Sequence, residues 1–458
     1  MNIMPYNSRK IVLNIITDVL EEKKPSHIVI KNEQDKLGYA SADNVNKAFI
    51  KRVSKGTIER KITLDYIIDQ YSNTPVKKMK PFIRELLRMS VYQIMYMDHI
   101  PDRAACNEAV KIVKESNFRN LSSFVNGVLR TISREKNNIK YPEKSDDIYK
   151  YMEIRYSIPE WLVKFLIEEN GISNTEEMLD CLFSDSDSIS VRVNVSKMAF
   201  EDVVELLKKD KVEVEITPLA DNIIILKNPG DIKRLKAFKM GLIQPQDISA
   251  AYVSQVAGVK PGMMVIDLCG APGGKTLHVA DLMNNTGKII SRDIYEHKIE
   301  LIRENANRCG FTNIETEIFS ATEYDDKYEG KADLVIADVP CSGLGVMKKK
   351  SDIKYNIKTD NIFELAEMSV SILTNAVKYL KKGGILIFST CTITKEENDY
   401  IREWLLETFD METSDITDYL SDEILQIGNN KDTAKEGFLK LFITEKYDGF
   451  YISKYIKK

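Results

Sequence analysis

An alternation of short apolar runs with amphipathic segments, beginning near residue 237, constrains the fold of this 458-residue chain more than any other feature. Four of the runs read MMVIDLC, KIISRDI, ADLVIADVP and GILIFSTC, and polar or glycine-containing turns follow them. The segments between them, such as HKIELIRENANRC, have the apolar spacing of helices. This alternation predicts a doubly wound, mainly parallel α/β sheet over residues 237–458. The last two runs, FLKLFIT and GFYISKYI, predict an antiparallel hairpin that closes it.

Three unusual turns follow strands of this predicted sheet. They read CGAPGGKT after the first strand, DVPCSGLG after the fourth and STCT after the fifth. Ligands of open parallel sheets bind outside the carboxyl ends of the strands. We therefore expect the three turns to converge on one site, although they are far apart in the sequence.

The first turn resembles a phosphate-binding P-loop only at its end. Gly274-Lys275-Thr276 fits that pattern, but Cys269 stands where the pattern requires its first glycine. The glycines of the turn let backbone N–H groups approach a ligand closely. Asp293, at the end of the second strand, is placed to bind ribose hydroxyls. The combination predicts an adenosine-type cofactor. The alternatives are a nucleotide-triphosphate hydrolase and a turn whose glycines serve only its tight bend.

The other two turns carry a carboxylate and two thiols, Asp338, Cys341 and Cys391. Two cysteines and an aspartate around a cofactor site suggest covalent catalysis, because a cysteine thiolate is a strong nucleophile once its surroundings activate it. A disulfide and a pair of inert core thiols are the competing interpretations. The six cysteines form no CxxC pair and the four histidines have no zinc spacing, so we expect no metal site.

Two features of the charge pattern suggest a polyanionic partner. Residues 1–140 carry 25 Lys and Arg against 15 Asp and Glu, whereas the rest of the chain is acidic. A lysine-rich segment also follows Cys341, and it predicts phosphate contacts. The lysines assigned to RNA are Lys348, Lys349, Lys350 and Lys354. Uneven surface charge and a solvated charge run are the respective alternatives.

The chain divides into three predicted domains. Residues 1–140 have helical periodicity, residues 141–236 start with a polar linker and continue as a small α+β module, and residues 237–458 form the α/β domain. The composition is that of an ordinary globular protein. No apolar run is long enough to span a membrane, and the first residues have no signal-peptide pattern. We therefore expect a cytoplasmic protein without membrane contact.

Several motifs resemble those of a known family. VIDLCGAPGGKT, DVPCSG and FSTCTITKEEN, with VRVN and QDISA upstream and DGFYISK downstream, resemble the motifs of RNA 5-methylcytosine methyltransferases. NEAVKIVK and FVNGVLR in the N-terminal third are similar to the NusB antitermination-factor domain. This order of domains is that of bacterial Sun/Fmu (RsmB-type) enzymes. The resemblance implies an all-α NusB-like RNA-binding domain, a middle RNA-recognition module and a Rossmann-like class I methyltransferase domain.

The resemblance also implies the cofactor, S-adenosylmethionine, and the residues that hold it. These are Cys269, Gly270, Ala271, Pro272, Gly273, Gly274, Lys275, Asp293, Ser320 and Asp338. Ser320 stands where the family usually has an aspartate, so Asp325 or Asp326 is an alternative there.

Catalytic roles are likewise implied by the resemblance. Cys391 would attack C6 of a cytosine, Asp338 would hydrogen-bond the ring N3, Lys275 would orient Asp338, and Cys341 would assist product release. The target base would have to leave its stack. The expected substrate is 16S ribosomal RNA, free or in an early subunit-assembly form, and the expected enzyme is a monomer. The alternative is a NusB-like RNA-binding factor with a vestigial methyltransferase domain.

Overall fold

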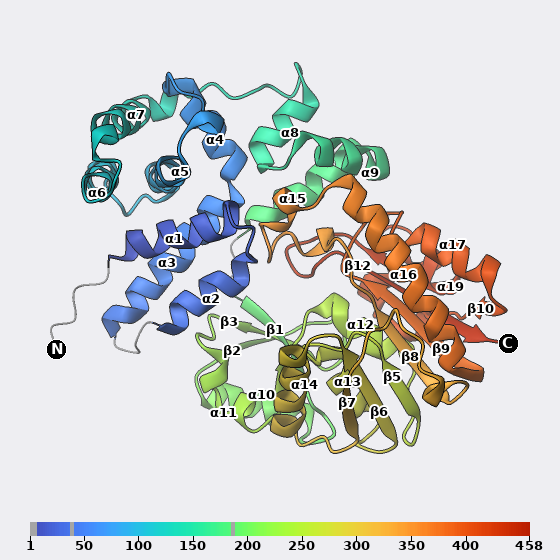
Figure 1. Ribbon diagram of the computed structural model, residues 1–458. Helices are drawn as coiled ribbons and strands as arrows, with labels where there is room; N and C mark the ends of the chain where they lie inside the picture. The colour runs from blue at the N-terminus through green and yellow to red at the C-terminus, as the bar shows by residue number, and fades with distance from the viewer. Residues whose placement is uncertain (1–6, 37–40, 185–187) are drawn as a thin grey trace. The chain divides into compact units, whose positions relative to one another are not determined.

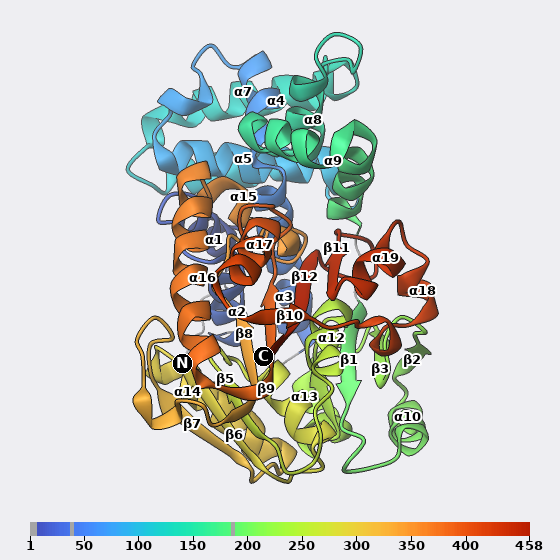
Figure 2. The same ribbon diagram turned by 90° about the vertical axis from the view of Figure 1, so that its right-hand side faces the viewer.

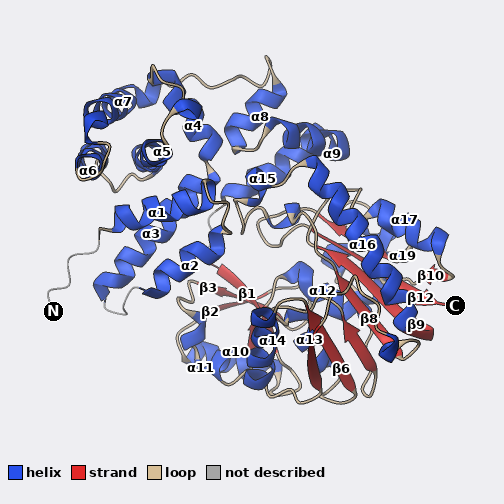
Figure 3. Ribbon diagram, viewed as in Figure 1, coloured by secondary structure: helices blue, strands red, loops and turns tan. Residues whose placement is uncertain are grey.

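The computed structural model describes residues 7–36, 41–184 and 188–458. The chain forms two compact units, of which the first, called the helical unit below, holds Met1–Leu182 and Met347–Ile357. The second, called the catalytic unit, holds Phe183–Val346 and Lys358–Lys458. Among the described residues every strand belongs to the catalytic unit (Figure 3). No helix in the described ranges is both long enough and apolar enough to cross a membrane.

The helical unit is built around one central helix, α5 (Figure 1). Its sequence has few exposed positions, and even the charged side chains of Glu85 and Arg88 are buried, where they form an ion pair with a nitrogen–oxygen distance of 2.6 Å. The helical periodicity predicted for the N-terminal domain is confirmed over its described residues, and residues 1–6 and 37–40 lie outside the described part. The helices of the unit are α1 (Ser8–Leu20), α2 (Ser26–Lys36), α3 (Ser41–Glu59), α4 (Lys61–Tyr71), α5 (Pro81–Tyr96), α6 (Asp102–Lys114), α7 (Ser122–Glu135), α8 (Ile148–Tyr156) and α9 (Glu160–Asp180).

A short excursion of the chain completes this unit. Met347–Ile357 follows the turn that carries Cys341 and contains α15 (Ile353–Asn356). The hydroxyl of Tyr355 donates to the carbonyl oxygen of Glu59 at 2.9 Å, and its ring packs against the core of the unit. The chain therefore leaves the catalytic unit after Val346 and returns to it at Lys358.

A small antiparallel sheet opens the catalytic unit, in the order β2-β3-β1-β4. Alternating side chains of β1 and β3, among them Val191 and Ile224, pack with α10 in a separate small core. The α+β character predicted for this segment is confirmed. Its elements are β1 (Ser188–Val193), α10 (Phe200–Lys209), β2 (Glu213–Ile216), β3 (Ile223–Lys227), α11 (Lys236–Lys239) and β4 (Ile243–Pro245).

The main sheet has eight strands, in the order β10-β12-β9-β8-β5-β6-β7, with β11 paired to β12. Strands β5 to β9 are parallel, and β12 runs antiparallel to both β9 and β11, so the predicted doubly wound sheet and its closing hairpin are confirmed. The strands are β5 (Met264–Asp267), β6 (Lys288–Asp293), β7 (Ile314–Ile318), β8 (Ala332–Asp338), β9 (Leu380–Thr390), β10 (Met411–Thr413), β11 (Phe438–Leu441) and β12 (Phe450–Lys457).

Helices cover both faces of this sheet, as Figure 2 shows. Successive residues of β5 face opposite layers: Val265 packs in the core formed with α12 and α13, and Ile266 in the core formed with α16 and α17. Burial on both faces explains why the strands read as continuous apolar runs. The strand order reverses beside β5, which places the expected ligand site at its carboxyl end. The helices are α12 (Ile248–Ala257), α13 (Gly274–Leu282), α14 (Glu296–Cys309), α16 (Thr359–Tyr379), α17 (Asp399–Thr408), α18 (Asp422–Leu425) and α19 (Asn430–Lys435).

A buried ion pair ties the small sheet to the main one. Arg192 on β1 contacts Asp281 on α13 at 3.0 Å, and the two side chains are 0% and 2% exposed. Arg192 also donates to Gln246, and Asp281 accepts the backbone N–H groups of Val195 and Ser196. VRVN and QDISA, which include Arg192 and Gln246, therefore join the two sheets.

We predict that Asp281→Asn destabilises the protein by about 3–5 kcal/mol, because it leaves the buried Arg192 charge without its counter-ion. The measurement is the urea-induced unfolding of the full chain. Glu205→Gln is the control, since the Glu205–Lys209 pair is exposed and contributes ~0–1 kcal/mol. An equal, small effect of both substitutions would show that the Arg192–Asp281 pair does not join the sheets.

Candidate active site

The glycine-rich turn between β5 and α13 has a backbone conformation and close contacts that residues with larger side chains would not fit. The backbone N–H of Gly270 donates to the carbonyl oxygen of Arg292 on β6 at 2.8 Å. A Cβ atom on Gly270 would lie 2.1 Å from Oγ of Ser291. Gly273 has φ of 102°, in the left-handed region that favours glycine, and α13 begins at the next residue. The turn therefore requires Gly270 and Gly273 for different physical reasons.

The surroundings of this turn fit a nucleoside better than a triphosphate. Asp293 ends β6 at the same edge of the sheet and is 6% exposed, and its carboxylate accepts the N–H of Tyr295 at 3.3 Å. Oδ1 of Asp267 is buried and has no hydrogen-bond partner among the described residues. A Cβ atom on Gly274 would meet nothing within 4 Å, so there is open space at the start of α13. Carboxylates beside an open glycine turn suit ribose hydroxyls and repel phosphates.

Ser320 lies at the same end of the sheet. The N–H of Phe319, which precedes it, donates to the carbonyl oxygen of Asp293 at 3.1 Å. The alternative residue Asp325 is engaged elsewhere, because its carboxylate pairs with the buried guanidinium of Arg292. Ser320 instead exchanges a hydrogen bond with the exposed Thr322 hydroxyl at 2.8 Å. The side chain of Asp325 is thus part of the Arg292 ion pair, whereas that of Ser320 is not.

Lys275 and Asp338 form the central polar contact. Nζ of Lys275 lies 2.6 Å from Oδ2 of Asp338, and the Ser389 hydroxyl donates to Oδ1 of Asp338 at 2.8 Å. Burial lowers the pKa of Lys275, but the charge and hydrogen bond of Asp338 outweigh it, so this pKa lies above its usual value. Lys275 is therefore a cation committed to Asp338, which argues against the P-loop interpretation of the turn.

The two thiols predicted to meet are in contact, with Sγ of Cys341 3.3 Å from Sγ of Cys391. The hydrogen bond to Cys391, together with burial, holds the pKa of Cys341 well above its ordinary value. The Cys341 thiol is therefore the one that holds its proton more tightly, and in the contact itself either sulfur can be the donor. Burial, followed by the charges of nearby carboxylates, also raises the pKa of Cys269, which makes that thiol a poor nucleophile.

Two consecutive residues, Glu397 and Asn398, hold the two cysteine turns. The buried carboxylate of Glu397 accepts both the backbone N–H and the hydroxyl of Ser342 at 2.6 Å, directly after Cys341. The Asn398 side chain accepts from the Thr390 hydroxyl at 2.6 Å and donates to the carbonyl oxygen of Thr392 at 3.2 Å, on both sides of Cys391. Both residues lie in the motif that suggested Cys391, but neither was among the predicted site residues.

Two further glycines bring the backbones of the site together. The N–H of Gly345 donates to the carbonyl oxygen of Cys391 at 3.0 Å, and the N–H of Gly449 donates to the carbonyl oxygen of Gly345 at 2.9 Å. A Cβ atom on Gly345 would lie 2.1 Å from the Gly449 carbonyl oxygen. The next residue, Phe450, places its ring centroid 5.3 Å from Nζ of Lys275. Residues 449–450 thus complete the site, which sequence reasoning did not anticipate.

One predicted RNA contact is wrong. Lys354 is only 2% exposed, and its Nζ donates to the carbonyl oxygens of Glu59 at 2.9 Å and Tyr156 at 3.3 Å. Burial lowers its pKa to about 7. The segment Met347–Ile357 packs into the helical unit, so Lys354 serves the fold of that unit. Lys348 and Lys350 are partly exposed and Lys349 is exposed.

Comparisons with known proteins agree with this architecture. Residues 255–456 match the model of the family "16S rRNA methyltransferase RsmB/F", residues 6–134 match the NusB family, and residues 158–233 match the ferredoxin-like domain of RsmF/B-like methyltransferases. A probable ribosomal RNA small subunit methyltransferase B of Bacillus subtilis is 34% identical over 454 residues, which cover 98% of both chains. Its counterpart in Synechocystis is 27% identical over 98% of both chains.

Solved structures show the same fold. The crystal structure of PH0851 superposes with a TM-score of 0.81 at 24% identity and covers 99% of this chain and 100% of that one. A methyltransferase homolog protein from Pyrococcus horikoshii has a TM-score of 0.57 at 26% identity, covering 68% of this chain and 100% of that one.

Fold and site together define a methyltransferase that uses S-adenosylmethionine. The chain belongs to the 16S rRNA methyltransferase RsmB/F family.

We predict that Gly270→Ala weakens the binding of S-adenosylmethionine about tenfold or more, since relieving the overlap with Ser291 costs ~1–3 kcal/mol. Isothermal titration calorimetry measures the affinity. Ser291→Ala in the same chain should restore it, because the overlapping Oγ is then gone. Gly127→Ala in α7 of the helical unit, whose Cβ likewise meets no atom within 4 Å, is the matched control and should bind normally. A failure of Ser291→Ala to restore binding would contradict this explanation.

We predict that Glu397→Gln loosens the Cys341 turn, because an amide cannot accept all the hydrogen bonds that this carboxylate accepts. Alkylation of Cys341 by iodoacetamide, followed by peptide mass spectrometry, should become about tenfold faster, the factor that corresponds to ~1.4 kcal/mol. Glu403→Gln, at an exposed position of α17, is the control. Unchanged alkylation in Glu397→Gln would mean that Glu397 does not hold the turn.

Proposed function

We propose that this protein transfers a methyl group to C5 of a cytosine in 16S ribosomal RNA through a covalent adduct with Cys391. One observation carries the proposal. A pair of thiols 3.3 Å apart adjoins the strand ends that bring Lys275 and Asp338 within 2.6 Å. A second thiol has no function in a simple one-step methyl transfer, whereas a covalent route needs groups for both addition and release.

Cys391 is the nucleophile in this mechanism. The raised pKa of Cys341 keeps that thiol protonated, so we assign it as the donor in the contact between the two sulfur atoms, which favours negative charge on Cys391. The positive charge of the Lys275 ammonium group also favours negative charge on Cys391. The same interaction contributes to the raised pKa of Lys275. The Cys391 thiolate adds to C6 of the cytosine, and the electron pair of the C5–C6 double bond moves toward C5 and N3. C5 thereby becomes nucleophilic.

Asp338 and Lys275 stabilise this adduct. Ser389 and Lys275 each donate a hydrogen bond to one oxygen of the Asp338 carboxylate and hold it in place. When electron density moves onto N3 of the adduct, N3 takes a proton from water, and the N3–H donates to this carboxylate. N3 gives the proton back when the product is released. The lysine, held by its hydrogen bond to Asp338, supplies the charge that offsets electron density on the ring. S-adenosylmethionine, held by residues 269–275 and Asp293 with Ser320 nearby, supplies when bound the electrophilic methyl group that C5 accepts.

Release of the product involves the second thiol. After methylation a base removes the C5 proton, the electron pair reforms the C5–C6 double bond, and the C6–sulfur bond to Cys391 breaks. Cys341, held by the Ser342–Glu397 hydrogen bonds, is in contact with the departing sulfur and donates its hydrogen bond to it. The thiolate that leaves is thereby stabilised at the moment it forms.

The substrate proposal extends to the rest of the chain. We assign 16S ribosomal RNA, free or in an early assembly form, as the substrate and a monomer as the active form. Lys348, Lys349 and Lys350 are proposed to contact its phosphates, and they lie at the start of the segment Met347–Ile357 of the helical unit. The predicted domains at 1–140, 141–236 and 237–458 remain our proposal for the modules that share this task.

We predict opposite phenotypes for the two cysteine variants. Cys391→Ala should lose methyl transfer entirely, and Cys341→Ala should accumulate an RNA–protein adduct that survives a denaturing gel, because addition proceeds and release is blocked. The assay uses labelled S-adenosylmethionine and 16S transcript, with gel mobility and label incorporation as readouts. Cys181→Ala, remote in sequence and in the helical unit, is the control with normal turnover. An adduct in Cys391→Ala would reverse the two roles.

Mapping the modified base distinguishes this function from its alternative. Nuclease digestion and mass spectrometry of the labelled RNA should yield 5-methylcytosine. Label at adenine or on a sugar would sink the proposal. Tight binding of RNA and S-adenosylmethionine without turnover would favour the alternative, an RNA-binding factor with a vestigial methyltransferase domain.

A further inference from the structure

The contact between Cys341 and Cys391 has a property that methyl transfer does not use. Both residues are free thiols, and their sulfur atoms lie 3.3 Å apart. A disulfide joins its sulfur atoms at about 2.05 Å, so an approach of about 1.3 Å separates the observed pair from that bond. The pair is thus reduced in this structure, yet placed so that oxidation can join it.

The backbone around the pair keeps the two turns side by side. β8 and β9 are parallel neighbours, and Asp338 is in register with Ser389. Because neighbouring strands lie about 4.8 Å apart, the turns that follow them begin within the span that a disulfide bridges. The N–H of Gly345 donates to the carbonyl oxygen of Cys391 at 3.0 Å, so the loop after Cys341 is bonded to the residue that its thiol has to meet.

The two thiols differ in the way that a reactive and a resolving cysteine differ. The positive charge of Lys275 favours the thiolate form of Cys391, and the thiolate is the form that peroxides oxidise. Cys341 holds its proton more tightly, first because of its hydrogen bond to Cys391 and then because of burial and the negative charge on Cys391. The two causes that come from Cys391 disappear once that sulfur is oxidised. Both cysteines are partly exposed, so a small oxidant can reach them.

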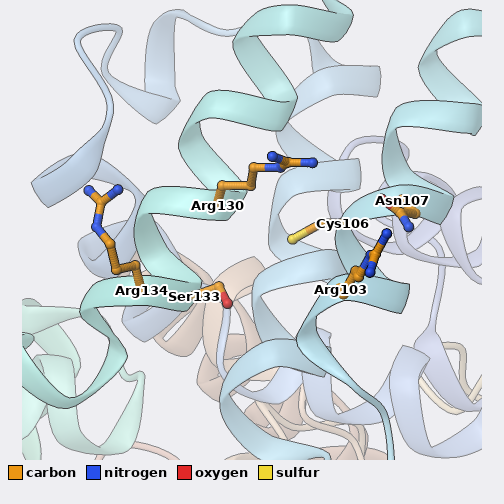
Figure 4. Close-up of a pocket in the computed structure, with 6 residues that line it drawn as sticks. All are labelled: Arg103, Cys106, Asn107, Arg130, Ser133 and Arg134. Atoms are coloured by element: carbon orange, nitrogen blue, oxygen red, sulfur yellow. The ribbon is translucent and has the colours of Figure 1, made fainter.

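Other cysteines of the chain have different surroundings. Cys106 is buried in the helical unit, where it lines a hollow with Arg103 and Arg130, and the residues lining this hollow include no second thiol (Figure 4). Burial raises the pKa of Cys106 and that of Cys269 in the cofactor turn, which makes both thiols slow to react. Cys309 is buried as well. We therefore expect oxidation to favour the Cys341–Cys391 pair.

We propose that Cys391 and Cys341 form a reversible redox switch, which hydrogen peroxide closes to a disulfide and a dithiol reductant opens again. The Cys391 thiolate attacks one peroxide oxygen, the O–O bond breaks, and a sulfenic acid forms on Cys391 while hydroxide leaves and takes up a proton. The sulfur of Cys341 then attacks the Cys391 sulfur, the S–S bond forms, and the hydroxyl group leaves with the Cys341 proton as water. Two thiols and one peroxide thus give one disulfide and two waters.

The switch regulates the proposed function and in this respect rests on it. A disulfide occupies the Cys391 sulfur, which then cannot add to C6 of a cytosine, and it removes the Cys341 thiol that assists release. The cofactor turn and Asp293 take no part in the bond, so S-adenosylmethionine should still bind. The bond also protects Cys391 from oxidation to the irreversible sulfinic acid. The oxidised protein is therefore inactive but intact, and reduction returns it to work.

The test treats the reduced full chain with stoichiometric hydrogen peroxide and maps its cysteines by mass spectrometry of unreduced peptides. The peptides of Cys341 and Cys391 should be linked, and methylation should slow at least about tenfold and recover with dithiothreitol, while calorimetry shows unchanged affinity for S-adenosylmethionine. Cys181→Ala, in the helical unit, is the control and should respond in the same way. Cys341→Ala is assessed by mass alone, and its Cys391 should proceed to sulfinic acid, which dithiothreitol does not reverse.

Peptide mapping needs no methylation assay, so failure of the switch and failure of the proposed function are distinguishable. If the proposed chemistry is wrong, the reduced chain forms no 5-methylcytosine although the disulfide still forms. If the switch is wrong, the reduced chain is active and the result of oxidation differs. A link to another cysteine, sulfinic acid on Cys391 of the unsubstituted chain in place of the link, or full activity of the linked chain would each overturn the switch.

Discussion

The parallel pairing of β8 with β9 is the constraint on which the site depends. Its register sets Asp338 beside Ser389, so the turns that follow the two strands begin at the same level of the sheet. Cys341 is three residues beyond Asp338 and Cys391 two residues beyond Ser389, and their sulfur atoms meet. A slip by one residue would turn each side chain of a strand to the other face. The register of β8 and β9 therefore decides which residues of the two turns meet, and so which chemical groups the site contains.

Backbone contacts hold the turns of the site together once the two strands are in register. Gly270, Gly345 and Gly449 each occupy a position where a Cβ atom would overlap a neighbour, so three segments can lie against one another. The side chains of Glu397 and Asn398 then fix the turns on which the two thiols lie. Close backbone packing and buried, satisfied polar groups make the thiol positions rigid, which catalysis by positioning requires.

The sequence predicted the fold well because the fold follows from periodicity. Alternating strands and helices identified the parallel sheet, and the rule that ligands bind at strand ends brought Lys275, Asp338, Cys341 and Cys391 together. Lys354 was misassigned because a lysine in a basic run resembles a surface residue, and only tertiary packing shows its capture by two carbonyl groups. Glu397 was passed over for a related reason: its partner, Ser342, is 55 residues away in the chain.

The excursion of Met347–Ile357 into the helical unit has a consequence for how such a protein can evolve. An appended domain joined by one linker can be gained, lost or exchanged by a single recombination event at the linker. Here the chain passes between the two units three times, once near residue 182 and twice around α15. Exchange of the helical unit would need a matching change inside the catalytic gene segment. Loss or exchange of the helical unit alone therefore requires changes at more than one place in the chain.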